Sequence, residues 1–261
     1  MTGAGVSAAS GIPTFRGSTA FDPSSSHDQD SSDRRPSAGV AYGRESASGG
    51  RLRSTDGLWK NYRAEELATP EAFRSDPQTV WEWYDWRRQL IAAARPNRAH
   101  EVLAGWSRLQ DGFTLITQNV DGLHERAGTR NVIRFHGSIW ELRCLESCRG
   151  PARHWDDARV PLPEVPRCPD CGGPARPGVV WFGEPIDPDT LRQSDRALDC
   201  DVCLVVGTSS LVYPAAGLAA VARERGAYAV EINPEPGASD VDLVIAGKAE
   251  EVLERIDSLI H

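Results

Sequence analysis

The chain has 261 residues, of which 40% are hydrophobic and 25% are charged. It is therefore long enough to bury a sizeable core, as one large domain or two smaller ones. Its formal net charge of −8 argues against a general nucleic-acid-binding protein, which usually presents a basic face. The sequence has no apolar run of about 18 residues and no secretory signal pattern, so we expect a cytoplasmic protein without a transmembrane helix.

A glycine-rich motif, "MTGAGVSAASGIPTFRG", opens the chain. Gly3, Gly5 and the small Ala8 fit a dinucleotide-binding turn, which should follow a β-strand and open a helix. Only Met1 and Thr2 precede the turn. We therefore expect that a helix and the first strand of the sheet, about 10–30 residues in all, are missing upstream. The chain as given should then be unstable or inactive.

Residues 18–56 are rich in Ser, Asp, Gly and Arg and poor in large apolar side chains. Such a segment cannot bury enough surface to offset the entropy lost on ordering. We interpret it as a disordered insertion, and a phosphosite-bearing regulatory loop is the alternative interpretation. Because it interrupts the loop after Gly17, it would affect closure over a bound nucleotide.

Regular elements are predicted in the rest of the chain from periodicity and capping residues. Asp76 can cap the first helix and Pro96 ends it. Helices are predicted at 77–94, 98–108, 211–226 and 249–260. Buried strands are predicted at 113–118, 179–183, 201–208, 227–233 and 242–247. Their alternation predicts an α/β fold, a doubly wound parallel sheet, with the cysteine segment 144–177 lying apart from it.

Two close cysteine pairs predict a metal site. Cys144-x3-Cys148 and Cys168-x2-Cys171 are separated by 19 residues, the spacing of a structural zinc ribbon. Four thiolates close the tetrahedron, so the zinc should hold structure and not activate water. Four unrelated thiols are the alternative.

A third pair, Cys200-x2-Cys203, has a similar spacing but lies at the entry to a hydrophobic strand. We interpret it as ordinary packing.

Polar side chains follow the strand at 113–118. Gln118, Asn119 and Asp121 emerge at its carboxyl end, where open parallel sheets bind ligands. Amides and a carboxylate together can grip a carboxamide or sugar hydroxyls. The alternative is a capped loop that starts a helix at Asp121.

His136, in "RFHGS", follows shortly after this polar loop. A single histidine is more often structural than catalytic, but its charge change near neutral pH makes it the natural general base. His100 and His124 lie within predicted helices, and we interpret them as structural or solvent-exposed.

Two further strand ends carry small polar groups. The amides and hydroxyls of Thr208 and Ser209 suit a phosphate at a helix start, and Asn233 suits ribose hydroxyls. Together with the opening glycine turn, these strand ends point to a dinucleotide.

These motifs, in this order, resemble the sirtuin family of NAD-dependent protein deacylases. The matching stretches are "TGAGVSAASGIPTFRG", "TQNVDGLHERAG", "FHGS", the two cysteine pairs, "VVWFGE", "GTSS" and "INPE". The resemblance covers everything but the insertion at 18–56. It implies a Rossmann-like NAD-binding domain at 1–17, 97–140 and 178–261. It also implies a smaller domain with a helical part at 57–96 and a zinc-ribbon part at 141–177.

The resemblance also implies site residues. His136 would be the general base. The residues that bind NAD would be Gly3, Ala4, Gly5, Ser7, Phe15, Arg16, Gln118, Asn119, Asp121, Gly207, Thr208, Ser209, Asn233 and Ala249. Asn119 and Asp121 would hold the nicotinamide carboxamide. The acyl-lysine tunnel would be lined by Val180, Trp181, Phe182, Gly183 and Glu184, pairing with the substrate backbone as an added strand.

The reaction implied by the resemblance consumes NAD. The acyl oxygen of an acyl-lysine on a protein substrate attacks the nicotinamide ribose, and His136 accepts a proton from a ribose hydroxyl. Nicotinamide leaves, the hydroxyl attacks the imidate carbon, and water then releases lysine and O-acyl-ADP-ribose. Tyr84-x2-Arg87 in "WEWYDWRRQL" resembles the pair carried by sirtuins that remove succinyl, malonyl or glutaryl groups. Residues i and i+3 share a helix face, and arginine suits a carboxylate, so we expect an acidic acyl-lysine; a structural helix with solvated arginines is the alternative.

Two other classes remain open on the sequence alone. One is a catalytically impaired NAD-binding regulator, which would carry identical ligand residues and is separated only by turnover. The other is a zinc-ribbon protein that binds nucleic acid, against which the acidic balance counts. We expect no direct nucleic-acid or membrane partner and favour a monomer.

Overall fold

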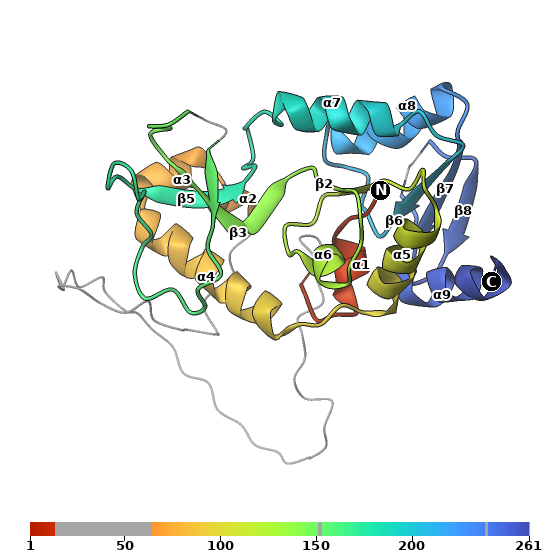
Figure 1. Cartoon of the computed structure of the whole chain (residues 1–261), viewed down its shortest axis with the longest axis horizontal. Coiled ribbons are helices and arrows are strands. Elements are labelled where there is room, and N and C mark those ends of the chain that lie inside the picture. The colour runs from red at the N-terminus through yellow and green to blue at the C-terminus, as the bar shows by residue number, and fades with distance from the viewer. Residues whose placement is uncertain (14–63, 151–152, 238–239, 261) are drawn as a thin grey trace, which may run out of the picture.

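The computed structural model describes residues 1–13, 64–150, 153–237 and 240–260 of the chain. The predicted insertion at 18–56 and the predicted site residues Phe15 and Arg16 lie outside these ranges. Figure 1 shows two lobes, one built around strands β6, β7 and β8 and the other around β3 and β5.

The larger lobe is built on a parallel sheet. Strand β1 (Leu115–Thr117) pairs with β2 (Val132–Arg134), and β6 (Val202–Val206) pairs with β7 (Tyr228–Asn233), which pairs with β8 (Leu243–Ala246).

Thr2 joins these two groups of strands, because it bridges Thr117 on one side and Val206 on the other. Its amide donates to the Ile116 carbonyl at 2.9 Å, and the Val206 amide donates to the Met1 carbonyl at 2.9 Å. The residues just before the glycine turn therefore lie inside the sheet, between β1 and β6.

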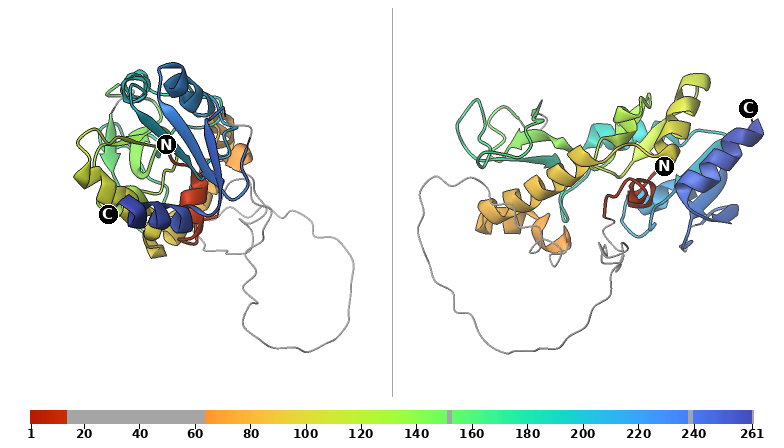
Figure 2. Two further views of the ribbon diagram at one scale, coloured as in Figure 1. Left: turned by 90° about the vertical axis from the view of Figure 1, so that its right-hand side faces the viewer. Right: turned by 90° about the horizontal axis from the view of Figure 1, so that it is seen from below.

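Helices cover both faces of this sheet. One face packs on α1 (Ala4–Ala8), α5 (Arg98–Leu109) and α9 (Ala249–Ile260). The other packs on α7 (Pro188–Ala197) and α8 (Leu218–Glu224). Figure 1 shows α7 and α8 along the upper side, with α5 and α9 below, and Figure 2 shows the same lobe from two further directions. The predicted doubly wound α/β sheet is confirmed.

The smaller lobe combines an antiparallel sheet with helices. Strand β3 (Gly137–Cys144) lies between β4 (His154–Asp156) and β5 (Ala175–Val179). Helices α2 (Ala64–Leu67), α3 (Pro70–Ser75) and α4 (Pro77–Ala93) complete the lobe. The core that they share contains Phe73, Trp81, Leu142 and Trp181. The cysteine segment therefore lies apart from the parallel sheet, as predicted.

Helix α4 attaches to the antiparallel sheet through buried polar side chains. The Arg88 guanidinium, which is 0% exposed, donates to the carbonyl oxygens of Ile139 and Asp157 at 2.9 and 2.8 Å. The Trp81 indole donates to the Ala175 carbonyl at 2.9 Å. Trp81 and Arg88 are seven positions apart, so one face of the helix carries both anchors.

Two predicted elements differ from the structure. The expected strand at 179–183 is wrong beyond Val179, because β5 ends there and the chain turns at Gly183, whose φ is +84°. The expected helix at 211–226 begins late, with a 3-10 turn η2 (Ala215–Gly217) before α8. Pro214 lacks the amide hydrogen that an earlier start would use. None of the described helices is long and apolar enough to cross a membrane.

Candidate active site

The opening glycine turn packs directly on the loop that follows β6. The Gly5 amide donates to the Gly207 carbonyl at 2.7 Å. A Cβ added to Gly5 would lie 2.8 Å from the Gly207 Cα, and one added to Gly3 would lie 2.8 Å from the Thr208 Cα. Gly207 has a φ of +58°, a conformation that glycine adopts without strain. Two motifs about 200 residues apart in the chain therefore form one backbone surface.

Ser7, Asn119 and Asp121 form a polar cluster beside this turn, in which Ser7 and Asp121 are buried and Asn119 is half-buried. The Ser7 hydroxyl donates to Asp121 Oδ2 at 2.7 Å, and the Asn119 side-chain amide donates to Ser7 Oγ at 3.1 Å. The amide of Leu123 donates to Asp121 Oδ1 at 2.9 Å. Helix α6 (Leu123–Arg126) starts there, so Asp121 serves the local helix start as well as the cluster. Burial raises the pKa of the Asp121 carboxyl.

His136 lies next to the same loop. Its Nδ1 is 3.2 Å from the Gln118 carbonyl oxygen. Because a carbonyl only accepts, the proton sits on Nδ1, and Nε2 of the neutral ring is left as the basic nitrogen. Burial lowers the pKa of His136, partly offset by this hydrogen bond, so the ring is neutral near pH 7. His136 is thus in the protonation state that a general base needs.

The other side of the glycine turn gathers Gln118, Thr208 and Asn233. The Gln118 side chain donates to Thr208 Oγ1 at 2.9 Å, and the Asn233 side chain donates to the Thr208 carbonyl at 2.8 Å. Ser209 is exposed beside them, while Ala249 is buried at the first position of α9. The polar groups of three strand ends therefore meet at one edge of the sheet, as the sequence predicted.

Two buried histidines support this edge, and the sequence analysis missed their part in it. His100 Nε2 lies 3.4 Å from Ser7 Oγ, and His124 Nε2 lies 3.0 Å from Thr2 Oγ1. The two rings are 4.7 Å apart between centroids. Burial lowers the pKa of His100 to about 4. One signal for this role was available in the sequence. His100 is the third residue after the capping residue Asn97, on the buried face of α5.

The segment 180–184 runs beside His136. The Val180 amide donates to the His136 carbonyl at 3.0 Å, and the Phe182 amide donates to the Ala68 carbonyl at 2.9 Å. Trp181 is 2% exposed and Phe182 is 40% exposed. Trp181 therefore anchors the segment in the small-lobe core, while Phe182 faces outward.

Tyr84 and Arg87 lie one turn apart on α4, close to this segment. The Trp181 indole donates to the Tyr84 hydroxyl at 3.0 Å, and burial raises the pKa of that phenol to about 12. Arg87 is 9% exposed, and its guanidinium carbon lies 5.1 Å from the centre of the Trp83 ring. The structure therefore holds a neutral phenol and a buried cation on neighbouring turns of one helix.

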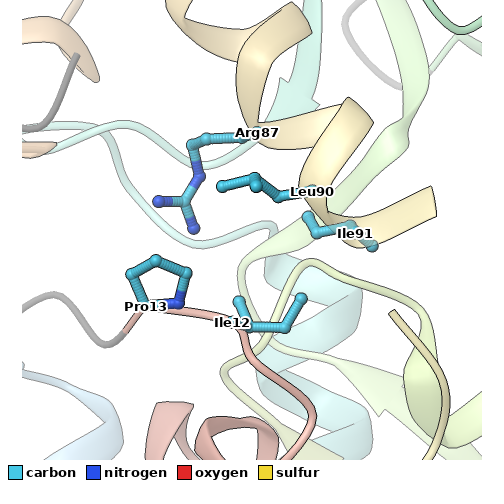
Figure 3. Close-up of a pocket in the computed structure, with 5 residues that line it drawn as sticks. All are labelled: Ile12, Pro13, Arg87, Leu90 and Ile91. Carbon is cyan, nitrogen blue, oxygen red and sulfur yellow. The ribbon is translucent and has the colours of Figure 1, made fainter. Parts of the chain in front are cut away.

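A small hollow opens in front of Arg87. It is lined by Ile12, Pro13, Arg87, Leu90 and Ile91. Figure 3 shows the Arg87 side chain reaching across it toward Pro13, with Leu90 and Ile91 beside it and Ile12 below. The residues of this hollow are apolar except for the arginine. The sequence analysis missed Ile12, which enters the hollow from the glycine-rich N-terminal segment.

The four predicted metal ligands come together at one end of the antiparallel sheet. The sulfur atoms of Cys144, Cys148, Cys168 and Cys171 all lie within 4.8 Å of one another. The Cys144–Cys171 and Cys148–Cys168 sulfur pairs are both 3.6 Å apart. A tetrahedron with zinc–sulfur bonds of about 2.3 Å has edges of about 3.8 Å, so the cluster fits zinc. Cys203, by contrast, is buried in β6 and belongs to no metal-type group among the described residues.

Comparisons with known proteins agree with this geometry. A family model described as the Sir2 family matches residues 45–214. The chain belongs to the Sir2 family. An NAD-dependent protein deacylase of Aquifex aeolicus (strain VF5) is 45% identical to this Sir2 chain over 260 residues, which cover 98% of the chain and 92% of that protein.

Solved Sir2 structures resemble the whole chain. A Sir2 homologue–NAD complex superposes with a TM-score of 0.79 at 42% identity, covering 99% of this chain and 87% of that one. A Sir2 homologue bound to 2′-O-acetyl ADP-ribose also gives a TM-score of 0.79 at 42% identity, covering 99% of this chain and 89% of that one. The predicted family and fold are therefore confirmed.

Proposed function

We propose that this Sir2 chain is an NAD-dependent protein deacylase, which removes acyl groups from lysine side chains of proteins and transfers them to ADP-ribose. One observation carries the proposal. His136 contacts the loop of the polar cluster through the Gln118 carbonyl, and contacts the segment 180–184 through its own carbonyl. His136 thus lies between the sheet edge that suits a dinucleotide and the segment 180–184, which suits a second substrate.

The nucleotide side would be held by the groups at the sheet edge. The glycine turn would lie against the diphosphate, and Asn119 and Asp121 would offer an amide and a carboxyl for the nicotinamide carboxamide. Gln118 and Asn233, both hydrogen-bonded to Thr208, would hold ribose hydroxyls. A Sir2 homologue that resembles this chain was solved with NAD, which supports NAD as the nucleotide.

The proton would move through His136. With Nδ1 donating to the Gln118 carbonyl, Nε2 accepts the proton of a ribose hydroxyl, and that hydroxyl then attacks the activated acyl group. NAD, when bound, would supply the glycosidic bond: the acyl oxygen would bond to the ribose carbon as nicotinamide leaves, and this would activate the acyl carbon. His136 is half-buried, so the bound substrates would complete the exclusion of water from this step.

The segment 180–184 would line the path of the acyl-lysine. Its amides at Val180, Trp181, Phe182 and Glu184 already donate within the chain. A substrate backbone added as a strand would therefore pair mainly with carbonyl groups of this segment.

The acyl group would be acidic: succinyl, malonyl or glutaryl. Apart from Arg87, the described residues that line the hollow are apolar, and burial lowers the pKa of the Arg87 guanidinium because desolvation disfavours its charged form. A carboxylate that reached it would form a bidentate, charge-assisted pair. Tyr84, which accepts from Trp181, keeps its own O–H to donate to the same acyl group.

The test is mass spectrometry of acetyl-, succinyl- and glutaryl-lysine peptides incubated with and without NAD. We expect NAD-dependent loss of the acyl group and formation of O-acyl-ADP-ribose. Arg87→Met should lower kcat/KM for succinyl-lysine about 100-fold and that for acetyl-lysine less than about 3-fold, because only the former loses a charge-assisted pair. Arg74→Met, which removes an arginine that is 66% exposed on α3, is the matched control.

Equal losses for both acyl groups in Arg87→Met would refute the carboxylate role. His136→Ala should lower turnover at least about 100-fold, the usual contribution of a general base. Binding of NAD without turnover of any peptide would instead establish a catalytically impaired regulator.

A further inference from the structure

Two arginines face each other across the antiparallel sheet next to the cysteine cluster. Arg143 on β3 is the register partner of Arg176 on β5, and the next pair along is Cys144 with Ala175. Like charges directly opposite on neighbouring strands destabilise a sheet. Arg176 is 4% exposed, so solvent screens little of this repulsion. The pair therefore needs an anion.

Glu184 supplies that anion. Arg143 Nη2 lies 3.0 Å from one Glu184 carboxylate oxygen and 3.2 Å from the other. Arg176 reaches the same carboxylate through both terminal nitrogens, with Nη2 at 2.9 Å from Oε2. One carboxylate thus bridges both arginines and offsets the repulsion between them.

The same carboxylate holds the backbone of the segment 180–184. The Trp181 amide donates to Glu184 Oε2 at 2.9 Å. The Arg176 guanidinium carbon lies 3.3 Å from the centre of the Trp181 ring, and the Trp181 indole donates to Tyr84. Trp181 is therefore fixed at its backbone, its ring face and its indole nitrogen, and each contact leads to a different part of the small lobe.

These contacts argue against Glu184 as a group that binds substrate. Both of its oxygens accept hydrogen bonds from two arginines, and Oε2 also accepts from the Trp181 amide. Both oxygens are engaged within the protein.

We propose that Glu184 is a positioning residue, and that the Arg143–Glu184–Arg176 cluster fixes the segment 180–184 against the cysteine-bearing sheet in the position that receives acyl-lysine. The role in acyl-lysine binding rests on the function proposed above. A change in the antiparallel sheet should therefore alter the affinity for the peptide. The nucleotide edge, formed by the glycine turn and the strand ends at Gln118, Thr208 and Asn233, is held by other contacts.

Glu184→Gln is the first variant. Glutamine keeps the shape and an acceptor for the Trp181 amide but removes the charge between the arginines. We expect KM for the acyl-lysine peptide to rise about 10-fold, with KM for NAD within about 2-fold of wild type, since a small displacement of a binding segment is costly. The metal content should not change.

Arg143→Met in the Glu184→Gln background is the second variant, and it separates positioning from general damage. Removing one arginine abolishes the repulsion that the neutral glutamine leaves uncompensated. We expect the double variant to recover at least half of the lost peptide affinity. A general loss of structure would instead make the double variant worse than either single one.

Amide hydrogen exchange provides a readout that does not depend on activity. The Trp181 amide should exchange about 10-fold faster in Glu184→Gln, while amides of β5 keep their protection. Unchanged exchange, an unchanged peptide KM, equal changes in both KM values, or a worsened double variant would each overturn the proposal. If wild type turned over no peptide but Trp181 exchange still rose and was restored in the double variant, the proposed function would fail while the clamp on the segment stood.

Discussion

The contacts that stabilise the larger lobe differ in kind from those that stabilise the smaller lobe. At the nucleotide edge, the glycine turn meets the loop after β6 through backbone atoms, with Gly3 and Gly5 against Gly207 and Thr208. In the small lobe, long polar side chains make the connections, as Arg88 does between α4 and the antiparallel sheet. Backbone contacts need small residues at fixed places in the sequence. Side-chain contacts can join elements whose sequences carry no shared pattern.

Metal removal should produce the largest difference in stability between the two lobes. Structural zinc contributes on the order of 10 kcal/mol to small domains, so chelation should unfold the sheet β4-β3-β5. We expect the parallel sheet to remain folded, because its core contains none of the four cysteine ligands. Regional hydrogen exchange measures both lobes at once, and binding of ADP-ribose checks the nucleotide edge. Simultaneous unfolding of both lobes would contradict the prediction that the metal stabilises only the smaller lobe.

A methyl group at the nucleotide edge should have the next largest effect. In Gly207→Ala the new Cβ would lie 2.6 Å from the Val6 amide nitrogen, at a φ of +58°. Overpacking and a left-handed conformation together should cost about 3 to 4 kcal/mol. The free energy of unfolding from urea titration measures it.

Gly105 provides the matched control for this substitution. A Cβ there meets no atom within 4 Å, and the residue lies inside α5. Gly105→Ala should therefore stabilise the protein by about 0.5 to 1 kcal/mol, because alanine favours helix more than glycine does. Similar losses in both variants would show that the backbone contact does not matter.

Acid should weaken the nucleotide edge through His100, with a smaller effect. Its pKa is lowered by burial to about 4 from 6.5, so the unfolded chain takes up this proton first as the pH falls. The stabilisation is complete above pH 6.5 and is lost between pH 6.5 and about 4, by no more than about 3 kcal/mol. His124, whose pKa burial also lowers, acts in the same direction, whereas Asp121, whose pKa burial raises, opposes it.

The variant His100→Gln isolates this contribution. Glutamine can still donate toward Ser7 but does not titrate. Thermal unfolding of both proteins from pH 7 to pH 4 should show a shallower loss in the variant. Parallel curves would show that His100 does not supply the pH dependence.

The helices were predicted nearly to the residue where local signals mark their ends. Helix α4 begins after Asp76, whose side chain accepts from the Thr79 amide, and α9 matches the predicted 249–260. Capping and periodicity lie within one turn of the helix, so the sequence alone contains them. Helix α7 has only Ser194 buried and carries no comparable apolar stripe, and it was not predicted.

The site was predictable to the extent that it consists of strand ends. Gln118, Asn119, Asn233 and Thr208 follow parallel strands, and the carboxyl ends of such strands meet at one edge. The partners of these residues were not predictable, because His100 reaches Ser7 from 93 positions away in sequence. The same reason explains the wrong strand at 179–183, whose apolar residues pack against distant side chains instead of joining the sheet.

Helix α4 makes three kinds of contact from one side: Trp81 and Arg88 donate to the antiparallel sheet, Tyr84 accepts from Trp181, and Arg87 lines the small hollow. Inserting one residue after Trp81 would turn everything downstream by about 100°. The fixed angles between side chains on this helix therefore tie the proposed acyl-group selectivity to the attachment of the antiparallel sheet. In such a scaffold, acyl-group selectivity would change through substitutions at fixed positions of the helix, and not through insertions or deletions in it.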